Sequence, residues 1–189
     1  QSRYVGAAYD ITDFIHFNRN NVLVVPANAS QYKGWFYEGA GIYRHVWLNQ
    51  YDNLHIATDG IFVHSTVANN KATVTIETSV DNENYSSSDC QVTAYLTDRG
   101  GRLVAKATDK TLSLPAGETK NVEQTIAVGT PRLWSIEDPY LYRAVVEIRQ
   151  SGKLIDKKIL RVGIRTVEIR TNGVFVNGKY IKLFGVNCH

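Results

Sequence analysis

Alternation of apolar and polar residues with a period of two runs through the central part of the chain. The pattern is clearest in residues 71–80, where alanine, valine and isoleucine alternate with lysine, threonine and glutamate. Three further segments repeat it: 91–97, 122–128 and 142–148. Such alternation is typical of strands that bury one face, and no segment shows a sustained helical period of 3.6 residues. The pattern therefore predicts an all-β protein.

Turn-forming residues separate these segments at intervals of roughly ten residues, as in β-sandwiches. Asn, Gly and Pro mark the turns at 69–70, 99–101, 115–117 and 151–152. We therefore predict a sandwich over residues 53–162, which matches an immunoglobulin-like domain in size. The Cys…Trp…Cys signature of antibody domains is missing, so the pattern supports the architecture and not that lineage.

Residues before the sandwich do not continue this spacing, and we assign residues 1–52 to a separate preceding domain. Residues 21–26 form a nearly continuous apolar run, as expected of a strand buried on both faces. Residues 42–48 alternate and predict a second strand. Only residues 10–15 hint at a helical turn.

Residues after the sandwich carry two Asn-Gly pairs, Asn172-Gly173 and Asn177-Gly178. Asn-Gly is the strongest short hairpin signal, because both central positions of a type I′ turn need a positive φ. The last segment, 180–187, turns apolar just before the sequence ends at His189. We expect the core to which this segment belongs to lie outside the chain.

Composition and charge exclude several classes of protein. The 21 basic and 18 acidic residues give a net charge of only +3 and are interspersed, which indicates a solvated surface and not a nucleic-acid-binding patch. No apolar run approaches the ~20 residues of a membrane helix, so no membrane partner is predicted. The chain begins with Gln1 and not Met, from which we expect processing upstream. The compartment stays undetermined, with the periplasm or exterior of a bacterium as a candidate.

Residues with catalytic or metal-binding chemistry are present but poorly arranged. The candidate carboxylate pairs are Asp10 with Asp13, Asp81 with Glu83, and Glu137 with Asp138. All fall in turns or at strand ends, where capping and solvation are the favoured interpretation. The five histidines show no metal-binding spacing, so no metal is predicted: His16, His45, His55, His64 and His189. The glycine-rich motifs that bind nucleotide phosphates are incomplete, so no cofactor is predicted either. Cys90 and Cys188 are interpreted as two free thiols.

Three separated stretches together resemble the family 2 glycoside hydrolases, which include β-galactosidases, β-glucuronidases and β-mannosidases. The first is Trp-Phe-Tyr-Glu-Gly-Ala-Gly-Ile-Tyr-Arg-His-Val-Trp-Leu at 35–48, and the second is Leu-Trp-Ser-Ile-Glu-Asp-Pro-Tyr-Leu-Tyr at 133–142. The third consists of Val-Gly-Ile-Arg-Thr-Val-Glu-Ile at 162–169, Phe-Val-Asn-Gly-Lys at 175–179 and Phe-Gly-Val-Asn-Cys-His at 184–189. Their order and spacing across nearly the whole chain make the resemblance specific.

The resemblance implies three domains or parts of domains. Residues 1–52 would be the C-terminal part of a jelly-roll sugar-binding domain, and residues 53–162 the immunoglobulin-like sandwich. Residues 163–189 would be a linker and the start of a catalytic (β/α)₈ barrel. The catalytic glutamates of the family lie beyond His189, so the resemblance implies no catalytic residue in this chain.

Asn187 and His189 match the family sequence Gly-Val-Asn-Arg-His at the end of the first barrel strand, which implies contact with the substrate. Cys188 stands where the family commonly has Arg, and this difference weakens any choice among sugars. Hydrogen bonding at the end of a strand is the alternative role for both residues.

The function implied for the parent protein is retaining hydrolysis of terminal β-linked sugars, with β-galactosides as the first choice. Its partner would be a carbohydrate substrate, and a homo-oligomer is a candidate assembly. Two other classes stay open for the chain: a carbohydrate-binding or adhesion module without hydrolase activity, and a sandwich that binds another protein.

Overall fold

The structure, a computed structural model, describes residues 6–28, 41–42 and 44–186. The chain divides into two compact units, residues 1–48 and residues 49–189, each of which is described by itself.

The N-terminal unit has one short element among its described residues, the 3₁₀ helix η1 (Thr12–Phe14). The carboxylate of Asp10 accepts a hydrogen bond from the N–H of Thr12 at 2.9 Å and so supports the start of this turn. The helical turn expected at 10–15 is therefore present. No membrane-spanning helix occurs in the parts of the chain that the structure describes.

The strands expected at 21–26 and 42–48 are wrong for the residues that the structure describes there. Val22, Leu23 and Val24 are 86%, 69% and 76% exposed, although the apolar run predicted burial on both faces. A strand needs a hydrogen-bonded neighbour as well as an apolar sequence. The described residues of this unit do not provide one.

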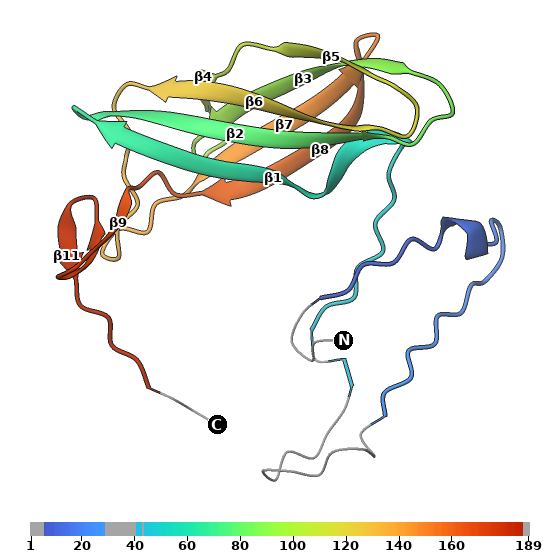
Figure 1. Cartoon of the computed structure of the whole chain (residues 1–189), viewed down its shortest axis with the longest axis horizontal. Helices are drawn as coiled ribbons and strands as arrows, with labels where there is room; N and C mark the ends of the chain where they lie inside the picture. The colour runs from blue at the N-terminus through green and yellow to red at the C-terminus, as the bar shows by residue number, and fades with distance from the viewer. Residues whose placement is uncertain (1–5, 29–40, 43, 187–189) are drawn as a thin grey trace. The chain divides into compact units, whose positions relative to one another are not determined.

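Two antiparallel sheets form a sandwich in the second unit (Figure 1). The first has the order β1-β2-β6, with β1 (Leu54–Ala68), β2 (Lys71–Asn82) and β6 (Thr119–Val128). The second has the order β4-β3-β7-β8, with β5 also paired to β3. Its strands are β3 (Ser88–Thr97), β4 (Leu103–Lys106), β5 (Lys110–Leu114), β7 (Tyr142–Gln150) and β8 (Lys153–Val162). This distribution, with strands one, two and six facing three, seven and eight, resembles that of immunoglobulin-like sandwiches.

The core lies between the two sheets and follows the alternation of the sequence. On β2, Val74, Ile76 and Val80 are at most 1% exposed, Thr78 is the one polar residue among them in the inward row, and the residues at odd positions between them face away. Inward residues of β3, β6 and β7 meet them from the other strands: Val92, Leu96, Ile126, Val146 and Ile148. The all-β prediction is confirmed.

Cys90 is a free, buried thiol on β3, and burial raises its pKa. Cys188 lies outside the described residues.

A buried carboxylate lies on the outer face of the second sheet. Glu147, 7% exposed, accepts hydrogen bonds from the Tyr95 hydroxyl at 2.9 Å and from Arg149 at 2.9 Å. Lys157 completes the group with an ion pair at 3.0 Å. Burial by itself would raise the pKa of Glu147, but these three partners outweigh burial and lower the pKa to about 2.

Acid is therefore expected to destabilise the sandwich through Glu147. Because the pKa is lower in the folded chain than its ordinary value of 4.5, the carboxylate contributes its full stabilisation above that value. This contribution is lost as the pH falls toward about 2. Replacing Glu147 by glutamine should remove roughly 1–3 kcal/mol at pH 7 and flatten the dependence of the melting temperature on pH.

The matched control for this experiment is Glu137→Gln. The pKa of Glu137 is also lowered to about 2, mainly by its hydrogen bond to Lys179, but both side chains are more than half exposed. Solvent screens such a pair, so we expect little change in stability. Equal effects of the two variants in thermal melts at pH 3 and pH 7 would contradict the conclusion that Glu147 makes the sandwich sensitive to acid.

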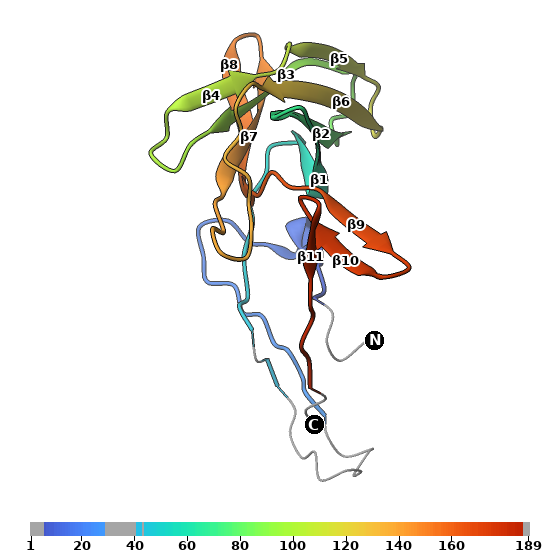
Figure 2. The same cartoon turned by 90° about the vertical axis from the view of Figure 1, so that its left-hand side faces the viewer.

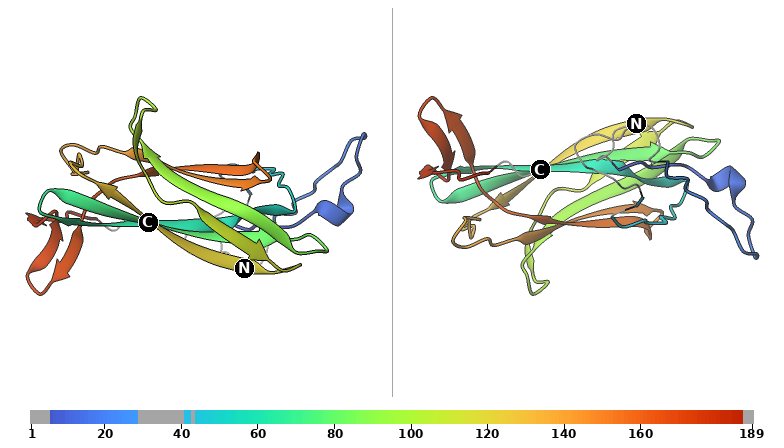
Figure 3. Two further views of the ribbon diagram at one scale, coloured as in Figure 1. Left: turned by 90° about the horizontal axis from the view of Figure 1, so that it is seen from above. Right: turned by 90° about the horizontal axis from the view of Figure 1, so that it is seen from below.

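A separate sheet of three short strands follows the sandwich, in the order β11-β10-β9 (Figure 2). Its strands are β9 (Val167–Arg170), β10 (Gly173–Val176) and β11 (Lys179–Ile181). It lies at the end of the sandwich where the β1–β2 turn is found (Figure 3). We call it the C-terminal sheet.

The two Asn-Gly pairs have different outcomes. Asn177 and Gly178 both have positive φ, 51° and 75°, as a type I′ turn requires. Gly173 instead pairs with Arg170 at the start of β10, so the loop before it is Thr171-Asn172. A Cβ atom on Gly173 would lie 2.5 Å from the ring of Tyr180, which explains why glycine fits there.

The apolar segment after β11 forms no strand over residues 182–186. Leu183, Phe184 and Val186 are 73%, 84% and 95% exposed. The described residues therefore contain no barrel strand after β11. The first strand of a barrel, which the family resemblance implies, stays a prediction.

Candidate functional site

The two residues predicted to bind substrate, Asn187 and His189, lie outside the described residues. Four of the described candidate carboxylates accept side-chain or backbone hydrogen bonds, and Asp13 and Glu83 do not: Asp10, Asp81, Glu137 and Asp138. The Thr119 hydroxyl donates to Asp81 at one end of the β2–β6 ladder. Glu137 and Asp138 are neighbours in sequence, but each forms an ion pair with a different cation.

The second and third stretches of the family resemblance meet in space, at the point where the chain leaves the sandwich. The N–H of Trp134 donates to the carbonyl of Ile164 at 2.9 Å. Trp134 also passes so close to Gly163 that a Cβ atom there would lie 2.9 Å from its Cβ and Cγ. Ile164 is 1% exposed and joins the core of the sandwich.

Asn177 fastens the C-terminal sheet to the same place. Its side-chain amide donates to the carbonyl of Trp134 at 2.9 Å, and its side-chain oxygen accepts from the N–H of Thr166 at 3.0 Å. Its own N–H donates to the carbonyl of Thr166 at 3.0 Å. Three hydrogen bonds to two segments therefore orient the β10–β11 turn.

A reciprocal pair of hydrogen bonds joins this region to the end of β1. The hydroxyl of Ser65 donates to the carbonyl of Arg165 at 3.0 Å and accepts from the N–H of Arg165 at 3.2 Å. The guanidinium of Arg165 lies 4.9 Å from the ring centroid of Trp134, close enough for a cation–π interaction.

Ion pairs stiffen the loop that carries Trp134. The guanidinium of Arg132 binds both carboxylate oxygens of Asp138, at 2.8 and 3.0 Å, and this bidentate pair lowers the pKa of Asp138. Arg132 and Arg99 both lie against the ring of Tyr140, 4.5 and 4.8 Å from its centroid. Lys179 reaches back from the C-terminal sheet to Glu137 at 2.6 Å.

We call this region the loop–sheet junction: the loop 132–142, the connection 163–166, and Asn177 with Lys179. Its polar groups are bonded to one another, and its rings are packed against guanidinium groups. Such an arrangement can fix the position of the segment that follows the sandwich. In the described ranges, no group of three or more His, Cys, Asp or Glu side chains could hold a metal ion.

The sequence identified the segments of the junction but not the contacts between their residues. Asn177 was predicted as a turn residue and as part of the third stretch of the family resemblance, and no contact was assigned to its side chain. Nothing in the sequence signals that its side chain reaches Trp134, 43 positions away.

The chain matches the model of the glycosyl hydrolases family 2 over residues 54–165, which span the sandwich and the first part of the junction. It is 33% identical to the β-galactosidase BoGH2A of Bacteroides ovatus, over 98% of this chain and 22% of that protein. It is 27% identical to a β-glucuronidase of Formosa agariphila, over 98% of this chain and 21% of that protein.

Among solved structures, a β-glucuronidase of Bacteroides uniformis aligns with a TM-score of 0.69 and 30% identity, over 78% of this chain and 19% of that one. A family 2 member from Bacteroides cellulosilyticus aligns with a TM-score of 0.67 and 32% identity, over 71% and 19%. The chain belongs to glycosyl hydrolases family 2. It spans about a fifth of the length of the curated relatives it matches.

Proposed function

We propose that the chain is the non-catalytic scaffold portion of a retaining glycoside hydrolase that hydrolyses terminal β-linked sugars, with β-galactosides as the substrate. The observation that carries this proposal is the loop–sheet junction. Two stretches typical of the family meet there, around Trp134 and Gly163, and hold the C-terminal sheet on the sandwich. A catalytic domain that follows this sheet would be positioned by the same contacts.

The domain assignment belongs to this proposal. Residues 1–52 are assigned to the end of a jelly-roll domain, 53–162 to the sandwich, and 163–189 to the linker and start of the catalytic barrel. The strands of the sandwich run from Leu54 to Val162, which supports the middle assignment. Asn187 and His189 would then reach the substrate from the first barrel strand.

The choice of β-galactosides rests on the relative from Bacteroides ovatus, which is named a β-galactosidase. Other relatives are named β-glucuronidases, so β-glucuronides are the competing substrates. The two classes differ by a carboxylate, and a site built to pair with that charge rejects the neutral sugar strongly.

The experiment compares the full-length protein with residues 1–189 alone, using 4-nitrophenyl β-D-galactoside and β-D-glucuronide. We expect the full-length protein to release nitrophenol from the galactoside faster than from the glucuronide. The 189-residue chain should release none above the buffer rate, because the two carboxylates of a retaining site would lie elsewhere.

Hydrolysis by the 189-residue chain would overturn the scaffold role. A full-length protein that cleaves neither sugar would favour the alternative, a carbohydrate-binding or adhesion module without hydrolase activity. Faster cleavage of the glucuronide would leave the scaffold role intact and correct the substrate.

A further inference from the structure

The two faces of the C-terminal sheet carry different kinds of side chain, because successive residues of a strand point to opposite sides. The register of the three strands places Glu168, Phe175 and Tyr180 in one row, with Arg170 and Gly173 beside them. The opposite face is aliphatic apart from Lys179 at one corner: Val167, Ile169, Val174, Val176 and Ile181. We call this second face the aliphatic face.

The aromatic and charged face is covered by its own side chains. The guanidinium of Arg170 lies 4.4 Å from the ring centroid of Phe175 and donates to the carboxylate of Glu168 at 2.9 Å. The ring of Tyr180 meets Phe175 edge-on, with 5.7 Å between the centroids. Both rings on this face therefore have neighbours within the sheet.

The aliphatic face has no comparable cover. Val167 and Ile169 are 56% and 85% exposed, and the three residues of β10 and β11 on this face are only partly buried. In the described part of the chain, none of the five packs against the core of the sandwich. A small sheet needs a covered apolar face to be stable, and an exposed apolar patch marks an interaction surface.

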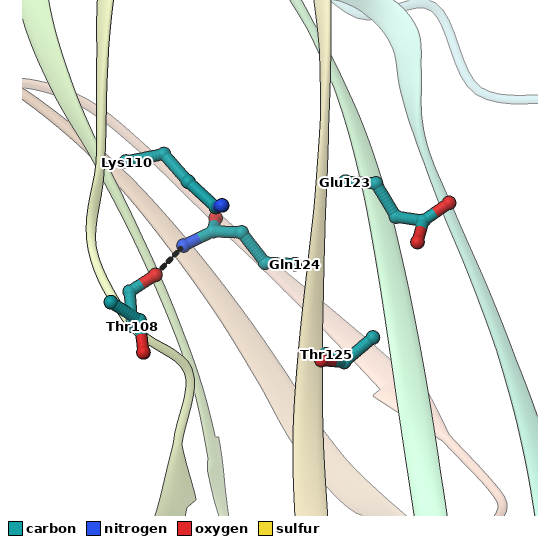
Figure 4. Close-up of a pocket in the computed structure, with 5 residues that line it drawn as sticks. All are labelled: Thr108, Lys110, Glu123, Gln124 and Thr125. Carbon is teal, nitrogen blue, oxygen red and sulfur yellow. Dashed lines mark hydrogen bonds between the residues drawn. The ribbon is translucent and has the colours of Figure 1, made fainter.

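The sandwich offers a pocket of a different character. An open pocket there is lined by polar and charged side chains of β5, β6 and the loop before β5: Thr108, Lys110, Glu123, Gln124 and Thr125 (Figure 4). The Gln124 amide is already bonded to the carbonyl of Thr108 at 2.8 Å. An apolar partner would have to desolvate these groups, whereas the aliphatic face presents almost none.

The position of the aliphatic face favours a partner that follows it in the same polypeptide. Residues 182–186 leave β11 with Leu183, Phe184 and Val186 exposed. An extended chain covers about 3.4 Å per residue, so these positions reach no farther than ~17 Å from β11. The chain spans only 22% and 21% of two curated relatives, so a parent of similar length has room for a further domain.

The size of the aliphatic face also argues against a separate molecule as the partner. A stable interface between two proteins uses about 20–30 residues on each side, and this face supplies five. A tethered domain needs less contact area, because the short link keeps its effective concentration high.

We propose that the aliphatic face is the surface on which the domain that follows residue 189 packs. That domain covers Val167, Ile169 and their neighbours with apolar side chains of its own. The C-terminal sheet is then held on both sides, by the loop–sheet junction at the sandwich and by this apolar contact. Only the statement that the following domain is catalytic rests on the proposed function.

The test is hydrogen exchange in the full-length protein and in the 189-residue chain. The backbone N–H groups of residues 167–181 should exchange at least about tenfold more slowly in the full-length protein, because packing suppresses local opening. Ile169→Lys should remove this extra protection and leave the melting temperature of the 189-residue chain unchanged. Ile159→Lys is the matched control, because it makes the same change at an isoleucine of β8 that is 57% exposed, and it should leave the protection intact.

Equal exchange of residues 167–181 in the two proteins would overturn the proposal, even if the full-length protein hydrolyses glycosides. Protection that survives Ile169→Lys would also overturn it, since the following domain would then lie elsewhere. Protection that rises with the concentration of the 189-residue chain would identify a second copy as the partner instead. A protected sheet in a full-length protein without glycosidase activity would support the packing and reject only the proposed function.

Discussion

Replacing Asn82 by alanine is expected to destabilise the sandwich by about 3 kcal/mol, a large part of the stability of such a domain. Asn82 ends β2 and is 1% exposed. Its side-chain nitrogen lies 2.9–3.0 Å from three carbonyl oxygens, those of Ser86, Leu114 and Pro115. Alanine would remove the donor that these carbonyls share, and the buried carbonyl of Leu114 would lose this partner; a buried polar group left unpaired costs roughly 1–3 kcal/mol.

The Asn82 side chain also organises the β2–β3 turn. Its oxygen accepts from the N–H of Asn84 at 3.2 Å and from the side-chain amide of Asn84 at 2.9 Å. Urea unfolding of Asn82→Ala should show a lower midpoint with an unchanged slope. Asn121→Ala is the control, because the side chain of Asn121 accepts a hydrogen bond from the Ser79 hydroxyl on the exposed face of the same sheet. Similar losses in both variants would show that the buried position of Asn82 is unimportant.

Replacing Gly163 by alanine is expected to destabilise the loop–sheet junction by about 1–3 kcal/mol. The new Cβ atom would lie 2.9 Å from Cβ and Cγ of Trp134, closer than carbon atoms approach without a shift. Since Trp134 is held by the carbonyl of Ile164, relief of the clash must move the loop or the connection. The amide protons of Trp134 and Asn177 should then exchange faster with solvent.

Gly129→Ala provides a matched comparison. A Cβ atom at Gly129 would meet nothing within 4 Å, so the same substitution should be neutral or slightly stabilising there, because it restricts the unfolded chain. Thermal melts and amide exchange of both variants measure the difference. Unchanged exchange at Trp134 in Gly163→Ala would rule out the proposed close packing.

The sequence predicted those strands of the sandwich that bury one face continuously. Residues 71–80 and 122–128 lie on such strands, where the inward positions are apolar except for Thr78 and Gln124 and the outward positions face water. β1 was not identified, because its register against β2 shifts between Ile56 and Ile61 and interrupts the alternation. The apolar run 21–26 shows the opposite error, since apolar residues alone do not provide a neighbouring strand.

The junction was harder to predict because its bonds join residues that are distant in sequence. Trp134 and Gly163 were both recognised within stretches typical of the family, yet only the coordinates show that they touch. The pocket beside Gln124 was not predicted at all. A glutamine in the inward row of a strand could have signalled it, but single exceptions to alternation are common in sequences.

The C-terminal sheet has its own hydrogen-bond ladder, separate from those of the two sandwich sheets. Elements with few ties to a core often open as independent cooperative units, well below the free energy of global unfolding. In this chain the polar contacts that hold the C-terminal sheet and the connection before it are those of Asn177 with Trp134, Lys179 with Glu137 and Ser65 with Arg165. Residues 167–181 should therefore behave as a low-stability foldon, so that motion or proteolytic cleavage there leaves the sandwich folded.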